Sequence, residues 1–449
     1  MSTVSAHAAC AQRSFIADTV TPIGAYRALE QVGASCLLES VESGAQLSRY
    51  SFIGLDYLAQ QTFAASPTLL PEIRAFVDEH SKAMGPTLGF PGAAVLACGY
   101  DAARAYARLG ERKPLSPPTP DAYVAIPGTW LIFDHYTHRL QIHTVAASEG
   151  EAAGRAEQYE HLLMHAHADI PETTGIQGAV TQSIDRDTYL ALVERIKAHI
   201  YDGDVYQLQL GIRFSAELRG EPLDLYRHLR SKNPSPYMFF MDTPFGQLLG
   251  ASPEFLVRLE EGRARIRPLA GTRSRGSSKS DDVAIERELL SNEKERAEHV
   301  MLVDLGRNDL GSVCKDGSVS VHELMHVERY SHVMHIVSDL VGDLREDCDG
   351  LDLFGAGFPA GTVTGTPKIR AMQLIDEFEP VSRGFYAGSI GRLEFGGNFD
   401  SCITLRSVHV AHGRAWWQAS AGIVADSDPQ SEYDEVFHKT RIIREVLGC

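Results

Sequence analysis

The sequence lacks the features that mark disulfide-rich, thiolate-metal and membrane proteins. It contains no CxxC pair, so neither a zinc ribbon nor a disulfide framework is expected. No apolar run approaches the roughly 20 residues that a membrane-spanning helix needs, and the opening MSTVSAHAACAQRSF does not have the pattern of a secretory signal. Reduced thiols in a cytoplasmic protein are therefore expected. The seven scattered cysteines are Cys10, Cys36, Cys98, Cys314, Cys348, Cys402 and Cys449.

Positive charge is also scarce. The chain has 59 acidic residues against 42 lysines and arginines, a net charge of −17, and it has no dense Lys/Arg run. This balance argues against a nucleic-acid binder, which needs a basic stripe. If such an acidic protein handles an acidic small molecule, it needs local compensation from a metal ion, a few arginines or backbone N–H groups.

The pattern along the chain predicts two regions joined by a linker. The stretch 167–183 is polar and rich in glycine and threonine, so it is expected to connect an N-terminal region, 1–166, to a C-terminal region, 184–449. Alternating apolar residues predict a hairpin at 122–146 and a meander at 385–425.

Apolar residues at helical spacing predict helices over 185–204, 282–305 and 431–447, and the last two each carry a pair of glutamates. Glu295 and Glu298 are three residues apart, and so are Glu432 and Glu435, so each pair shares a helix face. Four converging carboxylates would suit Mg²⁺, whereas histidine and cysteine at zinc spacing are absent. Spacing alone leaves open whether the pairs meet or are separate solvated faces.

Six motifs then occur in order: SPEFLVR, RPLAGTRSRG, ERAEHVMLVDLGRNDLG, VERYSHVMHIVSDLVG, FPAGTVTGTPKIRAM and AGIVADSDPQSEYDEV. With these motifs the chain resembles the chorismate-utilising enzymes, most closely anthranilate synthase component I. LLESVESG and RYSFIGL extend the similarity into the N-terminal region. The resemblance implies an α/β (α+β) sandwich of large, mostly antiparallel sheets with helices packed outside.

The resemblance also implies that the two glutamate-bearing helices meet around one Mg²⁺ that grips the ring carboxylate of chorismate. Glu298 and Glu435 match the inner ligands. Glu295 and Glu432 match residues that sit behind them, through water. With the cation bound, a site that would repel an anionic substrate attracts it instead.

Motif matches imply roles for further residues. Glu254 matches the general acid that protonates the leaving C4 hydroxyl, a role that requires a raised pKa, and His335 matches a histidine near the ring, linked to pyruvate elimination. Arg406 and Tyr386 match residues that bind the enolpyruvyl carboxylate. The other implied substrate contacts are Gly271, Thr272 and Thr362 in the pocket wall, the backbone N–H groups of Ser420, Ala421 and Gly422, and the positive charge of Lys439.

Two positions indicate ammonia as the nucleophile. Members of the family that use water place a general-base lysine where this chain has Gln207, and neutral glutamine is a poor base. The 4-amino-4-deoxychorismate synthases carry a lysine where this chain has Ala270. Amination directly at C2, followed by loss of pyruvate to give anthranilate, is therefore the expected reaction.

The ammonia is expected to come from another protein, because no glutaminase motif of the GxCxGxQ type occurs and Cys98 does not match one. A separate glutamine amidotransferase subunit is the implied partner. The resemblance further implies a tryptophan feedback site in and beside the N-terminal region, lined by Glu39, Ser40, Pro236, Tyr237 and Met238.

Some positions depart from the wording usual for component I. Glycine is usual at Ser420, and TVTGTPK, with Thr364 and Thr366, stands where TVSGAPK is more common. The alternatives are therefore a 2-amino-2-deoxyisochorismate synthase of secondary metabolism that stops before elimination, an isochorismate or salicylate synthase, and a non-catalytic relative.

Overall fold

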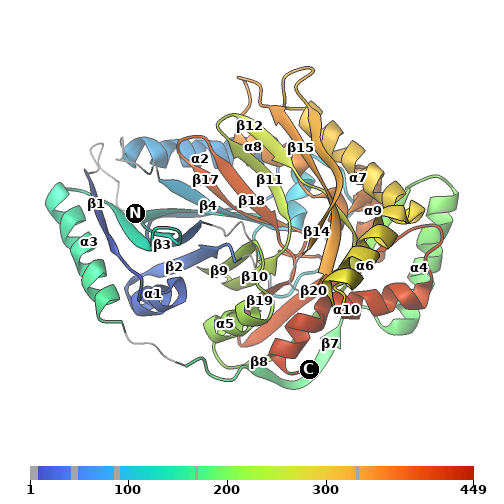
Figure 1. Cartoon of the computed structure of the whole chain (residues 1–449), viewed down its shortest axis with the longest axis horizontal. Coiled ribbons are helices and arrows are strands. Elements are labelled where there is room, and N and C mark those ends of the chain that lie inside the picture. Colours follow the sequence, from blue (N-terminus) through green and yellow to red (C-terminus); the bar gives the residue numbers. More distant parts are fainter. Residues whose placement is uncertain (1–8, 42–48, 85–89, 91, 167–169, 330–332) are drawn as a thin grey trace.

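The structure is a computed structural model, and it describes residues 9–41, 49–84, 90, 92–166, 170–329 and 333–449. Within these residues every strand pairing is antiparallel, and the helices lie on the outside of the sheets (Figure 1). The predicted fold class is thereby confirmed. No helix in the described part of the chain is both long and apolar enough to cross a membrane.

The strands and helices have the following bounds. The strands are β1 Ala9–Ile16, β2 Ala34–Glu39, β3 Tyr50–Phe63, β4 Ala93–Cys98, β5 Ala122–Asp134, β6 Arg139–Ala146, β7 Gly175–Gln182, β8 Gln207–Arg219, β9 Tyr237–Thr243, β10 Gly246–Ser252, β11 Phe255–Glu260, β12 Arg263–Ile266, β13 Leu269–Ser274, β14 Ser320–Arg329, β15 Val333–Asp343, β16 Gly365–Thr366, β17 Ser389–Glu394, β18 Phe399–Ile403, β19 Ser407–Ala411 and β20 Arg414–Ile423. The α-helices are α1 Pro22–Leu29, α2 Leu69–Met84, α3 Glu149–Met164, α4 Arg186–Tyr201, α5 Pro222–Lys232, α6 Lys279–Ser291, α7 Glu293–Gly311, α8 Gly350–Gly357, α9 Lys368–Phe378 and α10 Pro429–Leu447. The 3₁₀ turns are η1 Glu30–Val32, η2 Tyr100–Ala105 and η3 Gly361–Val363.

The strand pairings form two arms that meet at β5. One arm runs from β5 through β3, β2, β9, β10 and β19 to β20 and β8. The other runs through β4, β17, β18, β11 and β12 to β15, which also pairs with β13 and β14. Helix α10 packs on β20 at the end of the first arm, and α7 packs on β13 and β15 at the end of the second.

The division of the chain at 167–183 stays a prediction, but part of that range is not a free linker. Gly175–Gln182 forms β7, which pairs with β8. The N-terminal region is also paired with the rest of the chain, because β2 pairs with β9 and β4 pairs with β17.

The helix predicted over 282–305 is two helices instead of one. Asn292 has extended backbone angles, φ −71° and ψ 110°, and its side chain accepts a hydrogen bond from the backbone N–H of Glu295. Asparagine is a strong N-cap because its side-chain oxygen satisfies one of the free N–H groups of the first turn. The cap therefore ends α6 and starts α7 immediately before Glu295 and Glu298.

A buried ion pair ties the first arm to the segment after α9. Arg383 donates to Glu379 through Nε and Nη2, at 3.0 and 2.6 Å, and both side chains are almost fully buried. The same guanidinium donates to the carbonyl oxygens of Val363 at 2.7 Å and Gln209 at 2.9 Å. Glu379 in turn accepts from the backbone N–H of Gly211 at 2.8 Å.

Arg383→Met is expected to lower the free energy of unfolding by about 3–5 kcal/mol, because it leaves the Glu379 charge buried without its cation. Urea denaturation measures this loss. The double variant E379M/R383M removes both charges and is expected to be more stable than R383M, since a buried ion pair is often replaced by apolar groups at little cost. A double variant no more stable than R383M would contradict this account.

Candidate active site

Glu254 is a buried carboxyl at the start of β11. The residue is 7% exposed. Burial raises the pKa of its carboxyl to about 8, against smaller opposing effects of hydrogen bonds from the Thr362 hydroxyl and the Leu269 backbone. The Thr362 hydroxyl donates to Glu254 Oε1 at 3.2 Å. Both residues line a small cavity beneath α7. Such a carboxyl keeps its proton at neutral pH and can give it to a leaving group.

Two of the four glutamates in the Glu-x-x-Glu pairs, Glu298 and Glu432, have raised pKa values. Burial raises the pKa of the Glu298 carboxyl to about 7. The charge of Lys294 opposes this increase, and the carboxylates of Glu295, Glu432 and Glu435 add to it. The pKa of Glu432 is raised as well, first by burial and also by the charge of Glu435. The carboxyls carried by α7 and α10 therefore share one region of the molecule.

Three of these four glutamates have partners within the chain. Glu295 accepts from Arg273 at 2.9 Å, and Glu432 accepts from the Ser427 hydroxyl at 2.6 Å. Glu435 pairs with Lys439 at 2.7 Å. Glu298 makes no hydrogen bond or ion pair with another described residue.

This arrangement fits a divalent cation that prefers oxygen ligands. The Glu298 carboxyl is partly buried, makes no ion pair with a described residue and lies near three other carboxylates, and the charge of Lys294 only partly opposes the rise in its pKa, so a divalent cation would relieve a remaining cost. The donor atoms are carboxylate oxygens, which Mg²⁺ prefers. The assignment of Glu298 and Glu435 as inner ligands stays a prediction.

His335 lies near two positively charged side chains, those of Arg406 and Lys439. Burial lowers the pKa of His335 to about 4, and the positive charges of Arg406 and Lys439 lower it further, while a hydrogen bond with the Gly271 backbone opposes them. The imidazole is therefore neutral at pH 7 and can accept a proton. Arg406 has a positive φ of 46°, an unusual conformation for a residue other than glycine.

An irregularity in β13 between Ala270 and Thr272 places Gly271 close to the Glu295 carboxylate. Gly271 has φ +59°, and a Cβ added there would lie 3.1 Å from Glu295 Oε2. Any side chain at this position would press on the carboxylate and strain the backbone. The neighbouring Thr272 pairs with His335 in the β13–β15 ladder, but its side chain lies outside the described residues.

Tyr386, Ser420 and Gln209 form a buried chain of hydrogen bonds. The Tyr386 hydroxyl lies 2.8 Å from the Ser420 hydroxyl, which donates to Gln209 Oε1 at 2.8 Å. The carbonyl oxygen of Ser420 accepts from Lys439 Nζ at 2.9 Å, and Lys439 also pairs with Glu435. These contacts join the tyrosine to the carboxylates of α10.

Gln207 begins β8, the strand that also carries Gln209 and pairs with β20. Its side chain is 8% exposed, and its amide makes no hydrogen bond with another described residue. A Cβ at Gly422 would lie 2.6 Å from Gln207 Nε2 and 2.9 Å from Gln209 Nε2, so any larger residue there would displace the two side-chain amides. Ala421, between Ser420 and Gly422 in β20, is fully buried.

The five residues predicted for a regulatory site are brought together by the pairing of β2 with β9. Glu39 stands opposite Met238, and the backbone around Ser40 and Pro236 continues from these strands. The Tyr237 hydroxyl donates to Asp400 Oδ1 at 2.7 Å. The five residues are therefore contiguous in the first arm, where Glu39 and Met238 are buried.

Glu39 is fully partnered in this set. It accepts from the Tyr226 hydroxyl at 2.7 Å and from Arg230 at 3.0 and 3.1 Å.

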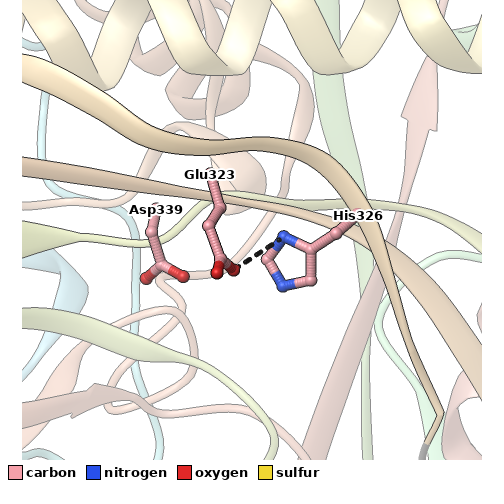
Figure 2. A group of neighbouring side chains, drawn as sticks. All are labelled: Glu323, His326 and Asp339. Carbon is pink, nitrogen blue, oxygen red and sulfur yellow. Dashed lines mark ion pairs between the residues drawn. The ribbon is translucent and has the colours of Figure 1, made fainter.

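One further group of possible metal ligands was not indicated by the sequence. Glu323 and His326 of β14 and Asp339 of β15 have ligand atoms within 4.8 Å of one another, and Figure 2 shows the two carboxyls beside each other with the imidazole next to Glu323. Arg265 and Arg267 lie 3.1 and 3.4 Å from Asp339. Because these guanidinium groups already offset the negative charge, we interpret the three residues as part of an ion-pair network. Its members come from two strands, so no sequence spacing indicates it.

A mostly apolar groove of about 860 Å³ opens beside α7 and α9 and contains none of the predicted site residues. Exposed side chains on its walls include Tyr206, Val300 and Ile369. Leu305 and Asp309 line both this groove and the small cavity at Glu254, so the two spaces are neighbours.

Residues 38–445 match the model of a family described as chorismate binding enzyme. The chain is 39% identical to anthranilate synthase component 1 of Acetivibrio thermocellus, over 96% of this chain and 93% of that protein. The crystal structure of anthranilate synthase component I from Streptococcus pneumoniae is similar, with 32% identity and a TM-score of 0.80 over 90% of this chain and 94% of that one. The menaquinone-specific isochorismate synthase of Escherichia coli shares the fold at 19% identity, with a TM-score of 0.79 over 98% and 95% of the two chains.

Proposed function

Because this chain belongs to the chorismate binding enzyme family, we propose that it is the large subunit of an anthranilate synthase. It would aminate chorismate at C2 with ammonia and then eliminate pyruvate to give anthranilate, as a lyase of tryptophan biosynthesis in the cytoplasm. The known relatives named anthranilate synthase component 1 support this assignment at about 40% identity.

The proposed acid step rests on Glu254. Its pKa of about 8 keeps the carboxyl protonated at neutral pH, so it can donate a proton to the C4 hydroxyl as that group leaves as water. Ammonia forms the new bond at C2 as both ring double bonds shift, from C1=C2 to C1=C6 and from C5=C6 to C4=C5, and the C4–O bond breaks with its electron pair leaving on the protonated oxygen as water. His335, neutral at pH 7, would accept a proton in the later loss of pyruvate.

Glu298 and Glu435 would hold the Mg²⁺, with Glu295 and Glu432 behind them. When bound, the cation would supply the positive charge that binds the ring carboxylate. Arg406 and Tyr386 would bind the second carboxylate, the guanidinium through paired hydrogen bonds.

The identity of residue 207 is the observation that most favours amination over hydration. The position where water-using relatives hold a basic lysine has a buried neutral amide here, 8% exposed. An amide is not a base at neutral pH and cannot activate water, whereas ammonia is nucleophilic without a base.

The test is a product assay with the purified chain, chorismate, Mg²⁺ and ammonium at pH 8. Fluorescent anthranilate and an equal amount of pyruvate are expected. Isochorismate or salicylate formed without ammonium would overturn amination, and no turnover even with an amidotransferase present would indicate a non-catalytic relative.

A second candidate is a 2-amino-2-deoxyisochorismate synthase, which would give an aminated product without pyruvate. Thr366 favours it, because its hydroxyl is buried without a partner in the described residues and it stands opposite Gln207 in the β16–β8 pair. A polar group at this position could hold the intermediate in place. The product assay separates the two activities.

Ammonia would come from a separate glutamine amidotransferase subunit. The relatives carry the name component 1, which is the name of one part of a larger enzyme. We expect activity with glutamine only when such a subunit is added, and activity with ammonium in its absence.

Tryptophan at the set of Glu39, Ser40, Pro236, Tyr237 and Met238 would inhibit the enzyme. Saturating tryptophan is expected to lower the rate with ammonium, by favouring a conformation that binds chorismate poorly. Glu39→Gln is expected to raise the half-inhibitory concentration, because it weakens the contact with Arg230 that fixes this part of β2. Phenylalanine is the control ligand, and a wild-type rate unchanged by tryptophan would refute the site.

A further inference from the structure

Ser420 occupies a position between two groups of the proposed site. It lies in β20, its side chain is 3% exposed, and its hydroxyl is in contact with both Tyr386 and Gln209. Its backbone carbonyl accepts from Lys439. A substitution at Ser420 that removes the hydroxyl therefore leaves the backbone contact with Lys439 in place.

The direction of the hydrogen bonds follows from counting hydrogens. A serine hydroxyl has one hydrogen to donate, and a glutamine amide oxygen can only accept. Because the Ser420 hydroxyl donates to Gln209 Oε1, it must accept from the Tyr386 hydroxyl. The single hydrogen of Tyr386 is thus directed at Ser420.

A tyrosine that binds a carboxylate must direct that hydrogen at the carboxylate instead. It can do so only if the Tyr386–Ser420 hydrogen bond breaks, or if the Gln209 amide turns over so that its NH₂ group donates to Ser420 and Ser420 donates to Tyr386. Either change costs free energy when the carboxylate binds. A variant with no hydroxyl at position 420 would not have this cost.

We propose that Ser420 is a positioning residue that sets the direction of the Tyr386 hydrogen bond and thereby weakens the binding of the substrate carboxylate. The proposal rests on the proposed function, because that function assigns Tyr386 to the carboxylate. It concerns affinity and leaves the chemical steps at Glu254 and His335 unchanged.

The experiment compares wild type with Ser420→Gly and Ser420→Ala, using chorismate and Mg²⁺ without ammonium, so that binding is measured by equilibrium titration without turnover. Both variants are expected to bind chorismate about five-fold more tightly, the factor that corresponds to a released hydrogen bond of about 1 kcal/mol. With ammonium present, KM is expected to fall by a similar factor and kcat to change less than two-fold. Ser420→Thr keeps the hydroxyl and is expected to bind as wild type does.

Tyr386→Phe provides the matched control. Combined with Ser420→Gly, it is expected to abolish the gain in affinity, because the gain depends on the Tyr386 hydroxyl. An equal gain in chorismate affinity with and without the Tyr386 hydroxyl would overturn the proposal. Unchanged or weaker chorismate binding in both Ser420→Gly and Ser420→Ala would also overturn it.

The two proposals can fail separately. If the product assay finds no anthranilate but Ser420→Gly still tightens chorismate binding through Tyr386, the role of Ser420 stands and the reaction is wrongly assigned. A ¹³C signal from the Cζ atom of Tyr386, identified by its loss in Tyr386→Phe, reports the same hydrogen bond directly. It is expected to shift in Ser420→Gly before chorismate is added, and an unchanged signal would contradict the inferred direction.

Discussion

Glu254→Gln is expected to lower kcat with ammonium by about a thousandfold, within the range of 10²–10⁴ that a general acid contributes. Glutamine has nearly the same shape and accepts the same hydrogen bond from Thr362, but it cannot give up a proton. Steady-state kinetics with chorismate measure the loss. Chorismate binding should change little, because the residue acts on the leaving hydroxyl and not on the carboxylates.

The dependence of wild-type kcat on pH should reflect the ionisation of Glu254. The pKa of Glu254 is about 8, so the acid form predominates at lower pH and is lost as the pH rises past that value. The basic limb of the kcat profile is therefore expected near pH 8. Thr362→Val removes a hydrogen bond that lowers this pKa, so the limb should move to higher pH.

Glu254→Gln should also make the protein more stable than wild type, and the difference should grow as the pH rises. The carboxyl ionises near its ordinary pKa of 4.5 when the chain is unfolded and near 8 when it is folded, so the native state loses stability between these values. The neutral amide has no such loss. Glu254→Gln should therefore exceed wild type in free energy of unfolding by an amount that grows from about pH 5 to pH 8, whereas Glu260→Gln, exposed at the far end of β11, should show neither effect.

Glu298→Gln is expected to lower activity at 1 mM Mg²⁺ by at least a hundredfold, because it removes a proposed metal ligand, a carboxylate that makes no ion pair with a described residue. Higher Mg²⁺ should restore part of the rate. Chelation of Mg²⁺ should abolish the wild-type reaction, and calorimetric titration with Mg²⁺ in the presence of chorismate measures the affinity. Glu293→Gln, exposed in the first turn of the same helix, is the control and should bind the metal normally.

Metal affinity should also depend on pH. The pKa of Glu298 is about 7, and a bound cation must displace its proton. Wild-type affinity is therefore expected to fall as the pH drops below 7 and to be constant well above it. Glu298→Gln, which has no proton to displace, should lose this dependence, and a variant that still weakens tenfold between pH 7 and 6 would show that another group controls binding.

The sequence predicted the antiparallel architecture well, because alternation and turn residues are local signals. It did not predict the break at Asn292, since helical spacing continues through a residue whose side chain caps the following turn. Nor could it place Glu298 near Glu435. Their carboxyls are brought together by the packing of α7 and α10 on different arms, and only the family resemblance led to that expectation.

Burial and hydrogen-bond direction were also outside the reach of the sequence. The pKa of Glu254 depends on the cavity that surrounds it, and the chain from Tyr386 through Ser420 to Gln209 joins residues from three separate segments. The sequence showed only that Ser420 departs from the usual glycine. What that hydroxyl contacts became visible once the strands β8 and β20 were paired.

The pairing of β2 with β9 and of β4 with β17 has a consequence for how the gene can be divided. A fragment beginning at residue 184 would keep every residue assigned to chorismate and magnesium, yet it would leave β9, β17 and β8 each without one of its paired neighbours, because β2, β4 and β7 all lie before residue 184. Unpaired strand edges recruit other chains and cause aggregation. The residues before 184 thus serve the second half of the protein as a built-in protective partner, and the smallest fragment that can remain monodisperse must contain β2, β4 and β7.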